Sequence, residues 1–405
     1  MKAIQYTFDI PRYAAGLALG KIHTSLLWSG LSCTALRELP EPELRGDEWV
    51  KIKTRYGGIC GTDTSTIHLK TSPYYSPFSS SPFTLGHENV GEIVEVGAEA
   101  GQWQVGQRVI ANPLLWCAPR GFDEWCPSCA RGEINLCERY TEGDLARGII
   151  LGACRDTSGS WSPYFIAHRS QLHAVPDAIS DEDALMVEPF ACGLHAALLD
   201  FPKDDETILL LGAGTIGLMQ LAALRALGSR ATILVAARYA FQAEAALKLG
   251  ASEVFTGGDL YKQVAARTGA KLLKPLIGKR VIVGGADRTY ECVGNDSALD
   301  DALRLTKSGG LVMVVGVPGL AKGIDWTAVF SQELQVRAAQ AYGQAEVWQG
   351  KPWDAFALTL DLMERGELDL GWMVNRRYAL DEYKQALKQQ GNKKQYPVIK
   401  AVFEF

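Results

Sequence analysis

The chain lacks the features that mark exported and membrane-spanning proteins. No apolar run among its 405 residues approaches the roughly 20 residues that a membrane helix needs. Residues 1–10 do not pair a basic segment with an apolar one, as a secretory signal would. We therefore expect a cytoplasmic protein without a membrane anchor.

Excess positive charge is also missing. The formal net charge is -5, and a mildly acidic chain is a poor match for nucleic acid or an anionic membrane as its main partner. A small, local basic site remains compatible with this balance. We accordingly expect a small-molecule substrate, no nucleic acid partner and no membrane partner.

What the chain does have is apolar sequence and clustered cysteine. Hydrophobic residues make up 47% of it, enough for a sizeable core, and its length allows two or three domains. Nine cysteines are present, and four of them lie between Cys117 and Cys137. In a chain without an export signal, such a cluster indicates a metal site before it indicates disulfides.

The sequence pattern changes twice along the chain. The first half holds short β-type runs broken by Gly and Pro, which predict an irregular, mostly antiparallel domain. Near Asp205 the pattern becomes alternating buried strand and helix, typical of a parallel α/β sheet, and it reverts after about Ala341. We therefore predict an inserted nucleotide-type domain at 190–340 within a catalytic domain formed by 1–189 and 341–405. The expected strands are 48–56, 89–96, 107–111, 207–211, 231–236, 288–293, 310–317 and 396–403, and the expected helices of the inserted domain include 216–227 and 241–249.

A glycine-rich turn follows the first strand of the inserted domain. The run Gly212-Ala213-Gly214-Thr215-Ile216-Gly217 fits the dinucleotide-binding pattern, with a buried strand before it and a helix after it. In that context the first Gly permits a tight turn, the second lets the backbone approach a pyrophosphate, and the third lets the helix pack on the strand. The alternative is an ordinary tight turn between strand and helix.

The end of the second strand of this domain bears on the choice of cofactor. An acidic residue there would bind the ribose 2′-OH of NAD, but the sequence has Ala237 followed by Arg238. A cation without an acid suits a 2′-phosphate, so NADP(H) is favoured over NAD(H). The alternative is that Arg238 is a solvated surface residue.

Cys117, Cys126, Cys129 and Cys137 lie in a turn-rich lobe at 112–140. Four thiolates satisfy a tetrahedral structural zinc with no open position. Free thiols are one alternative, but they would invite oxidation. A DNA-binding zinc ribbon is another, but acidic residues that would repel phosphates lie in and around the lobe, namely Asp123, Glu124, Glu133 and Glu138.

A second set of metal-type ligands is dispersed along the first domain. Cys60 begins the run Cys-Gly-Thr-Asp, His87 and Glu88 follow Gly86, and Glu188 precedes a proline. Cysteine, histidine and carboxylate ligands together with water make a catalytic zinc site that is open at one position.

These motifs, in this order, resemble the zinc-containing medium-chain alcohol dehydrogenases over nearly the full length of the chain. The resemblance implies a Rossmann-type doubly wound parallel sheet inserted in a mostly β, GroES-like catalytic domain, with two zinc ions per chain. Glu188 is similar to the acidic ligand of the polyol and threonine dehydrogenase branches, in place of a second Cys. Either Glu88 or Glu188 could be the direct ligand. The lobe departs from the family pattern because residues 118–125 are inserted between its first two cysteines.

The resemblance also implies a function. Zinc at Cys60 and His87 would act as a Lewis acid towards the oxygen of a secondary alcohol, polyol or ketone. Thr62 would relay the proton outward, and Asp63 would orient His87. Hydride would pass to or from a nicotinamide. The residues expected to bind the cofactor are Gly212, Gly214, Thr215, Ile216, Gly217, Ala237, Arg238, Val293, Val315, Gly316 and Val317.

Two other functions stay open at this stage. One is a non-catalytic protein of the same fold that binds NADPH and zinc as a sensor or structural component. The other is a zinc-free enone reductase, which conflicts with both zinc motifs.

The chain is also expected to self-associate as a dimer or tetramer. Leu334, Val336 and Ala338 alternate with polar residues, as in a half-buried strand at a sheet edge, and such an edge tends to be paired or covered.

Overall fold

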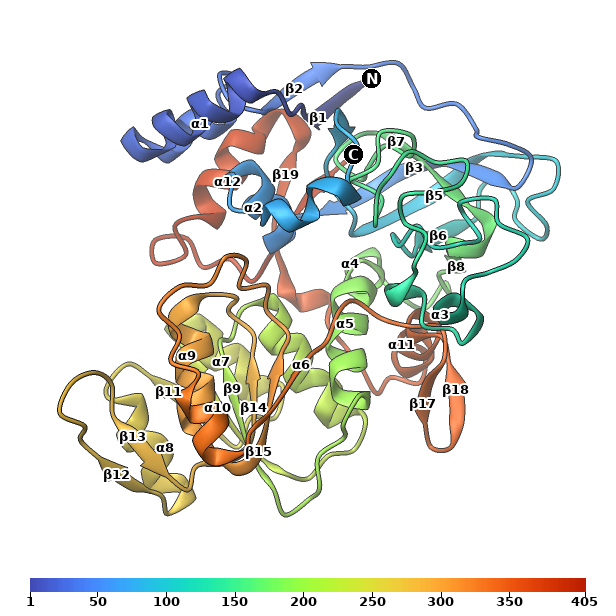
Figure 1. Cartoon of the computed structure of the whole chain (residues 1–405). Coiled ribbons are helices and arrows are strands. Elements are labelled where there is room, and N and C mark those ends of the chain that lie inside the picture. The colour runs from blue at the N-terminus through green and yellow to red at the C-terminus, as the bar shows by residue number, and fades with distance from the viewer. The chain divides into compact units, whose positions relative to one another are not determined.

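The computed structural model describes residues 1–405 and divides the chain into two compact units. The first unit comprises Met1–Glu188, Gly343–Ala345 and Pro352–Phe405, and the second comprises Pro189–Tyr342 and Glu346–Lys351. The chain thus leaves the first unit, builds the second and returns (Figure 1). None of the helices combines the length and apolarity needed to cross a membrane.

Two sheets form the framework of the first unit. Its seven-stranded sheet follows the order β19-β20-β3-β5-β6-β8, with β7 paired to β3, and its three-stranded sheet follows the order β2-β1-β4. The strands are β1 (Lys2–Tyr6), β2 (Thr34–Glu38), β3 (Trp49–Gly58), β4 (Phe83–Thr84), β5 (Asn89–Val96), β6 (Arg108–Ala111), β7 (Tyr164–His168), β8 (Leu172–Ala174), β19 (Val374–Ala379) and β20 (Lys400–Glu404).

Alternation of side chains explains these strands. In β3 the side chains of Val50, Ile52 and Thr54 are buried, and the lysines between them are partly or fully exposed to solvent. This alternation is the two-residue period of a strand. The predicted start of the last strand at Tyr396 is wrong, since β20 begins only at Lys400. Pro397 lies between these positions and has no N–H for a ladder.

Short helices connect the strands of the first unit. The segment between β1 and β2 forms α1, capped by the Asp9 side chain that accepts from Arg12 N–H at 2.8 Å. The helices are α1 (Ile10–Ile22), α2 (Gly61–Ile67), α3 (Pro127–Ala130), α4 (Asp181–Leu185), α11 (Ala355–Glu364) and α12 (Tyr383–Gln390), with 3-10 turns η1 (Thr24–Trp28), η2 (Pro73–Phe78), η3 (Ile134–Leu136), η4 (Arg169–Gln171), η5 (Gly371–Met373) and η6 (Leu380–Glu382).

The second unit is built on a six-stranded parallel sheet in the order β11-β10-β9-β14-β15-β16. This is the doubly wound order 3-2-1-4-5-6, in which ligands bind beyond the carboxyl ends of the strands. The strands are β9 (Thr207–Leu211), β10 (Thr232–Ala237), β11 (Glu253–Thr256), β14 (Ala286–Glu291), β15 (Thr306–Val314) and β16 (Gln335–Ala338). The helices are α5 (Val187–Leu198), which begins in the first unit, α6 (Thr215–Ala226), α7 (Ala240–Lys248), α8 (Leu260–Thr268), α9 (Asp296–Leu305) and α10 (Thr327–Gln332), and one hairpin adds β12 (Lys271–Leu273) and β13 (Val281–Val283). A second hairpin, of β17 (Glu346–Trp348) and β18 (Lys351–Trp353), begins in the second unit and ends in the first.

The predicted strands of the second unit are confirmed, with shifts at their ends. The strand predicted to reach Val293 ends at Glu291, because the Glu291 carboxylate binds the N–H groups of Val293 and Gly294 at 2.8 and 2.9 Å. The edge position of β16 is also confirmed. Its predicted half burial is wrong, since all four of its residues are exposed and only Leu334, just before it, enters the core.

Candidate active site

Cys60 lies at the point where β3 has ended and α2 begins. The Cys60 N–H donates to the Asp63 carboxylate at 3.1 Å, and Asp63 is buried in the first turn of the helix. A carboxylate in that turn also interacts favourably with the helix dipole. The short Cys-Gly-Thr-Asp run therefore fixes the Cys60 backbone and a buried carboxylate together.

His87 and Glu88 lie on the turn that enters β5. Gly86 in this turn has φ +93°, and a Cβ there would approach within 2.2 Å of the Trp161 ring, so only glycine fits. The turn places His87 Nδ1 at 3.4 Å from Asp63 Oδ1. Asp63 thus contacts both the Cys60 backbone and the His87 ring, which leaves Nε2 as the remaining ligand atom of that ring.

The side chains of Cys60, His87 and Glu88 converge. Their ligand atoms all lie within 4.8 Å of one another. Burial opposes protonation of His87, but the charges of Asp63 and Cys60 raise its pKa well above the ordinary value. The site thus attracts positive charge, and a thiolate, an imidazole and a carboxylate together are a donor set that zinc accepts.

Lys400 completes this cluster and was missed from the sequence. It forms an ion pair with Glu88, and both side chains are 1% exposed. Burial opposes the charge of Lys400, but Glu88, Cys60 and Glu188 together raise its pKa. The available signal was a single cation in the otherwise apolar run from Val398 to Phe403.

The other two predicted catalytic residues are placed differently. Glu188 is half-buried near the start of α5 and lies outside the group formed by Cys60, His87 and Glu88, although it acts electrostatically on Lys400. Thr62 is exposed in the first turn of α2. Of the predicted ligands, Glu88 is thus the carboxylate that the structure brings to Cys60 and His87.

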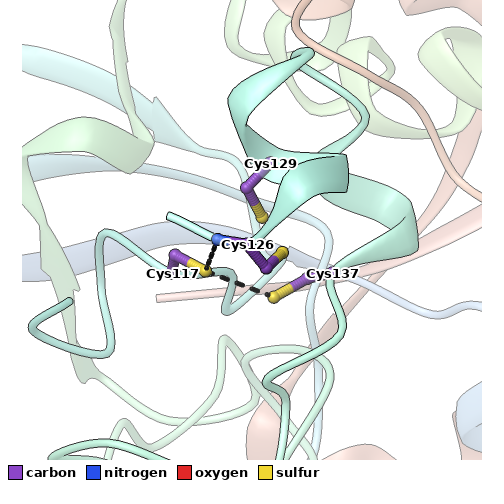
Figure 2. Close-up of side chains that lie close together, drawn as sticks. All are labelled: Cys117, Cys126, Cys129 and Cys137. Carbon is purple, nitrogen blue, oxygen red and sulfur yellow. Dashed lines mark hydrogen bonds between the residues drawn. The ribbon is translucent and has the colours of Figure 1, made fainter. Parts of the chain in front are cut away.

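The four cysteines of the lobe point towards one another (Figure 2). Their sulfur atoms all lie within 4.8 Å, with Cys117 Sγ and Cys137 Sγ separated by 3.8 Å. The insertion at 118–125 therefore does not displace Cys117 from the group. Backbone N–H groups of Cys126, Glu138 and Arg139 donate to sulfur atoms of the lobe at 3.4, 3.5 and 3.4 Å. A hydrogen bond from Cys129 lowers the pKa of Cys137, while burial raises the pKa of Cys117. These donors stabilise thiolates, so the group fits a closed zinc site.

The inserted segment contributes a buried cation. Arg120 is fully buried, and its guanidinium donates to five backbone carbonyl groups. A buried charge is tolerated when its hydrogen bonds are complete. Arg120 therefore ties the segment before the cysteine group to the segment after it. The acceptors are Leu115, Glu142, Leu145, Ala146 and Gly148.

In the second unit, the glycine-rich turn lies between β9 and α6. Gly212 has φ +98°, and a Cβ on Gly217 would lie 1.9 Å from the Gly212 carbonyl oxygen. A Cβ on Gly214 would meet no atom within 4 Å. Gly214 also caps α6, so Thr215 and Ile216 begin a helix beside this open space. The positive end of a helix dipole next to open space suits a pyrophosphate.

The other predicted cofactor residues lie at the same carboxyl edge of the sheet. Strand β10 ends at Ala237, and Arg238 follows it, exposed, with its guanidinium 5.5 Å from the Tyr239 ring centre. The Glu291 carbonyl accepts from the N–H groups of Val315 and Gly316 at 2.9 and 2.8 Å.

Glu291 therefore joins the loop after β14 to the loop after β15. The side chains of Val293 and Val317 in these loops are 48% and 55% exposed, which leaves apolar surface for a ligand. The role of Glu291 was not foreseen, although an acid at a strand end was a usable signal.

Comparisons with known proteins give the same organisation. Residues 46–177 match the alcohol dehydrogenase GroES-like domain, and residues 215–356 match the zinc-binding dehydrogenase family. Sorbitol dehydrogenase of Bacillus subtilis (strain 168) is 28% identical over 87% of this chain and 89% of its own. L-threonine 3-dehydrogenase of Shewanella woodyi is 29% identical over 86% of this chain and 90% of its own.

Among solved structures, a protein from Sinorhizobium meliloti 1021, described as a zinc-binding dehydrogenase bound to NADP, has a TM-score of 0.72. It is 26% identical, and the match covers 92% of this chain and 96% of that one.

We predict two zinc ions per chain with different roles. Cys60→Ser should remove about one zinc and abolish turnover while the protein stays folded. Cys129→Ser should lower the thermal midpoint, since binding of a structural zinc contributes folding free energy directly. Metal analysis and calorimetry on both variants check this, and undamaged wild-type protein with one zinc or none would contradict it.

The two glycines of the nucleotide turn should respond differently to an added methyl group. Gly214→Ala should fold normally but weaken dinucleotide binding, because its Cβ occupies space open to the ligand. Gly217→Ala should lower the free energy of unfolding, because its Cβ collides with backbone. Titration calorimetry with the dinucleotide and thermal melts separate the effects, and equal binding by wild type and Gly214→Ala would show that the turn does not hold the pyrophosphate.

Proposed function

Since the chain belongs to the zinc-containing medium-chain alcohol dehydrogenases and is a nicotinamide-dependent zinc dehydrogenase, we propose that it interconverts a secondary alcohol or polyol and the corresponding ketone, with NADP(H) as the preferred cofactor. The observation that carries this proposal is the convergence of Cys60, His87 and Glu88 beside the buried Lys400. A protein that used zinc only for structure would need the four-cysteine site but not this second cluster of metal ligands.

The residues around this cluster have separate roles. Cys60, His87 and Glu88 would hold a zinc ion, which would supply a Lewis acid for the substrate oxygen. Asp63 holds the ring of His87 at Nδ1, and Lys400 balances the negative charge of Glu88. Thr62 carries a hydroxyl exposed to solvent two residues beyond Cys60, from which the substrate proton can leave. We keep Glu188 as an alternative ligand to Glu88.

Relatives guide the substrate class. The two curated relatives described above are named for sorbitol and L-threonine, both of which carry a secondary hydroxyl beside another polar group. We propose a substrate of that kind. Oxidation of a panel of secondary alcohols, polyols and β-hydroxy amino acids, with NADP and NAD in parallel, tests the proposal. Cys60→Ser is the control, and turnover of the panel by that variant would contradict it.

The preference for NADP(H) is supported by the end of β10. The strand ends at Ala237 without an acid to repel a 2′-phosphate, and Arg238 is exposed beside it. An arginine can contact phosphate through two N–H groups. A solved structure with the same fold was obtained with NADP.

Removing the arginine should abolish most of the cofactor preference. A hydrogen bond to a charged group contributes roughly 1.5–3 kcal/mol, which corresponds to a preference of roughly ten- to a hundredfold. Arg238→Ala should therefore raise the Michaelis constant for NADPH and leave that for NADH nearly unchanged, and Ala237→Asp should favour NADH by repulsion. Steady-state kinetics with both cofactors measure this, and equal kcat/KM values in the wild type would refute the preference.

We further propose that two chains pair along β16. The Ala339 N–H donates to Val314 in β15 at 3.0 Å. Since donors alternate along a strand, the N–H groups of Val336 and Ala338 face the open edge. All four residues of β16 are exposed, and an exposed edge of this kind tends to be covered.

Val336→Pro should weaken assembly while leaving the fold intact. Proline removes one outward donor and is tolerated at a strand edge. Light scattering should show a dimer or larger assembly for the wild type and a shift towards monomer for Val336→Pro, with circular dichroism as the control for folding. A wild-type protein that stays monomeric at micromolar concentration would overturn the proposal.

A further inference from the structure

A basic, apolar hairpin interrupts the nucleotide-type unit. Strands β12 and β13 pair antiparallel between α8 and β14, at one side of the unit (Figure 1). Because the hairpin leads into the start of β14, it lies towards the amino ends of the sheet strands. The cofactor loops lie at the opposite, carboxyl edge, so the hairpin is separate from these loops.

The two faces of the hairpin differ. Leu272 and Ile282 point inward and join the core of the unit. Their neighbours Leu273, Val281 and Val283 are 42%, 38% and 54% exposed, so the outward face is apolar as well. The inner face therefore holds the hairpin in place, and the outer face has no partner within the chain.

The tip of the hairpin is still more exposed. Leu276 and Ile277 are 104% and 92% exposed, which means that neither side chain packs on any part of the chain. Exposed apolar groups that gather in one place indicate an interaction surface rather than chance.

The charge of this segment departs from that of the whole chain. Residues 260–286 contain no Asp or Glu and six cations, although the chain as a whole has a net charge of -5. Three of these cations pair with acids outside the segment, namely Arg267, Lys279 and Arg280. Lys262, Lys271 and Lys274 are exposed and form no ion pair, and the last two lie on the hairpin.

We propose that the β12–β13 hairpin docks the protein reversibly on an anionic lipid surface. Leu276 and Ile277 would enter the boundary between headgroups and acyl chains, and Lys271 and Lys274 would lie against anionic headgroups. An apolar tip flanked by unpaired lysines is complementary to an anionic lipid surface, because the tip can enter the acyl region while the lysines attract the headgroups. Nucleic acid is a weaker match, because residues 262–289 contain no aromatic side chain on which a base could stack.

Vesicle co-sedimentation of the full-length, zinc-loaded protein tests this proposal. We expect binding to phosphatidylcholine vesicles that contain phosphatidylserine, little binding to phosphatidylcholine alone, and loss of binding at high salt. Lys271→Gln/Lys274→Gln should weaken binding about 30-fold at low salt, from about 1 kcal/mol per lysine. Leu276→Ser/Ile277→Ser should weaken it by at least about tenfold.

A second hairpin, formed by β17 and β18, gives the matched control. Val347 is 65% exposed on β17, and Lys351 begins β18, so Val347→Ser/Lys351→Gln should bind vesicles as the wild type does. Ile277→Trp should bind more tightly, with fluorescence that shifts to the blue on binding. All variants are compared by thermal melts for folding.

Three results would overturn the proposal. The first is absence of binding to anionic vesicles, or binding that the tip variant leaves unchanged. The second is self-association that the tip variant abolishes, measured by light scattering without vesicles, which would make a second copy the occupant. The third is binding to duplex DNA that depends on the lysines but not on the tip.

Discussion

The ion pair between Lys400 and Glu88 is the constraint on which the candidate active site depends. Lys400 comes from the last strand of the chain, and Glu88 comes from the turn before β5. More than half of the sequence separates them, and the whole second unit is built in between. The first unit is therefore complete only when the chain has returned, and the pair forms beside Cys60 and His87.

Burial makes this pair costly to disturb. Both side chains are 1% exposed, and a buried charge that loses its partner is strongly destabilising. The same arrangement places a carboxylate next to a thiol and an imidazole, a donor set that a divalent metal accepts. Asp63 adds a second fixed contact by binding the Cys60 backbone and the His87 ring. Asp63 thereby fixes Cys60 and His87 relative to each other.

Local sequence patterns were enough to predict much of this architecture. The alternation of buried strand and helix predicted the parallel sheet, and the spacing of Gly212, Gly214 and Gly217 predicted the nucleotide turn. The cysteine cluster predicted the lobe. Each of these features is encoded within a short stretch, so periodicity and residue type suffice to recognise it.

The contacts that escaped prediction join distant segments. From the sequence, Lys400 is indistinguishable from the other residues of a terminal strand, and no neighbouring residue indicates that it pairs with Glu88. Arg120 reads as part of an unexplained insertion, although its hydrogen bonds span the cysteine group. The half burial expected for β16 was wrong because alternation in sequence does not specify what covers a strand.

A double-mutant cycle on Lys400 and Glu88 tests the central claim most directly. Lys400→Met leaves a buried carboxylate without its partner, and it should lower the free energy of unfolding by about 3–5 kcal/mol. Lys400→Met/Glu88→Gln should recover much of that loss, because no buried charge then remains unpaired. The measurement is denaturant unfolding of the wild type and the three variants in matched zinc. Single variants as stable as the wild type, or a double variant that shows only the sum of the single losses, would contradict the account.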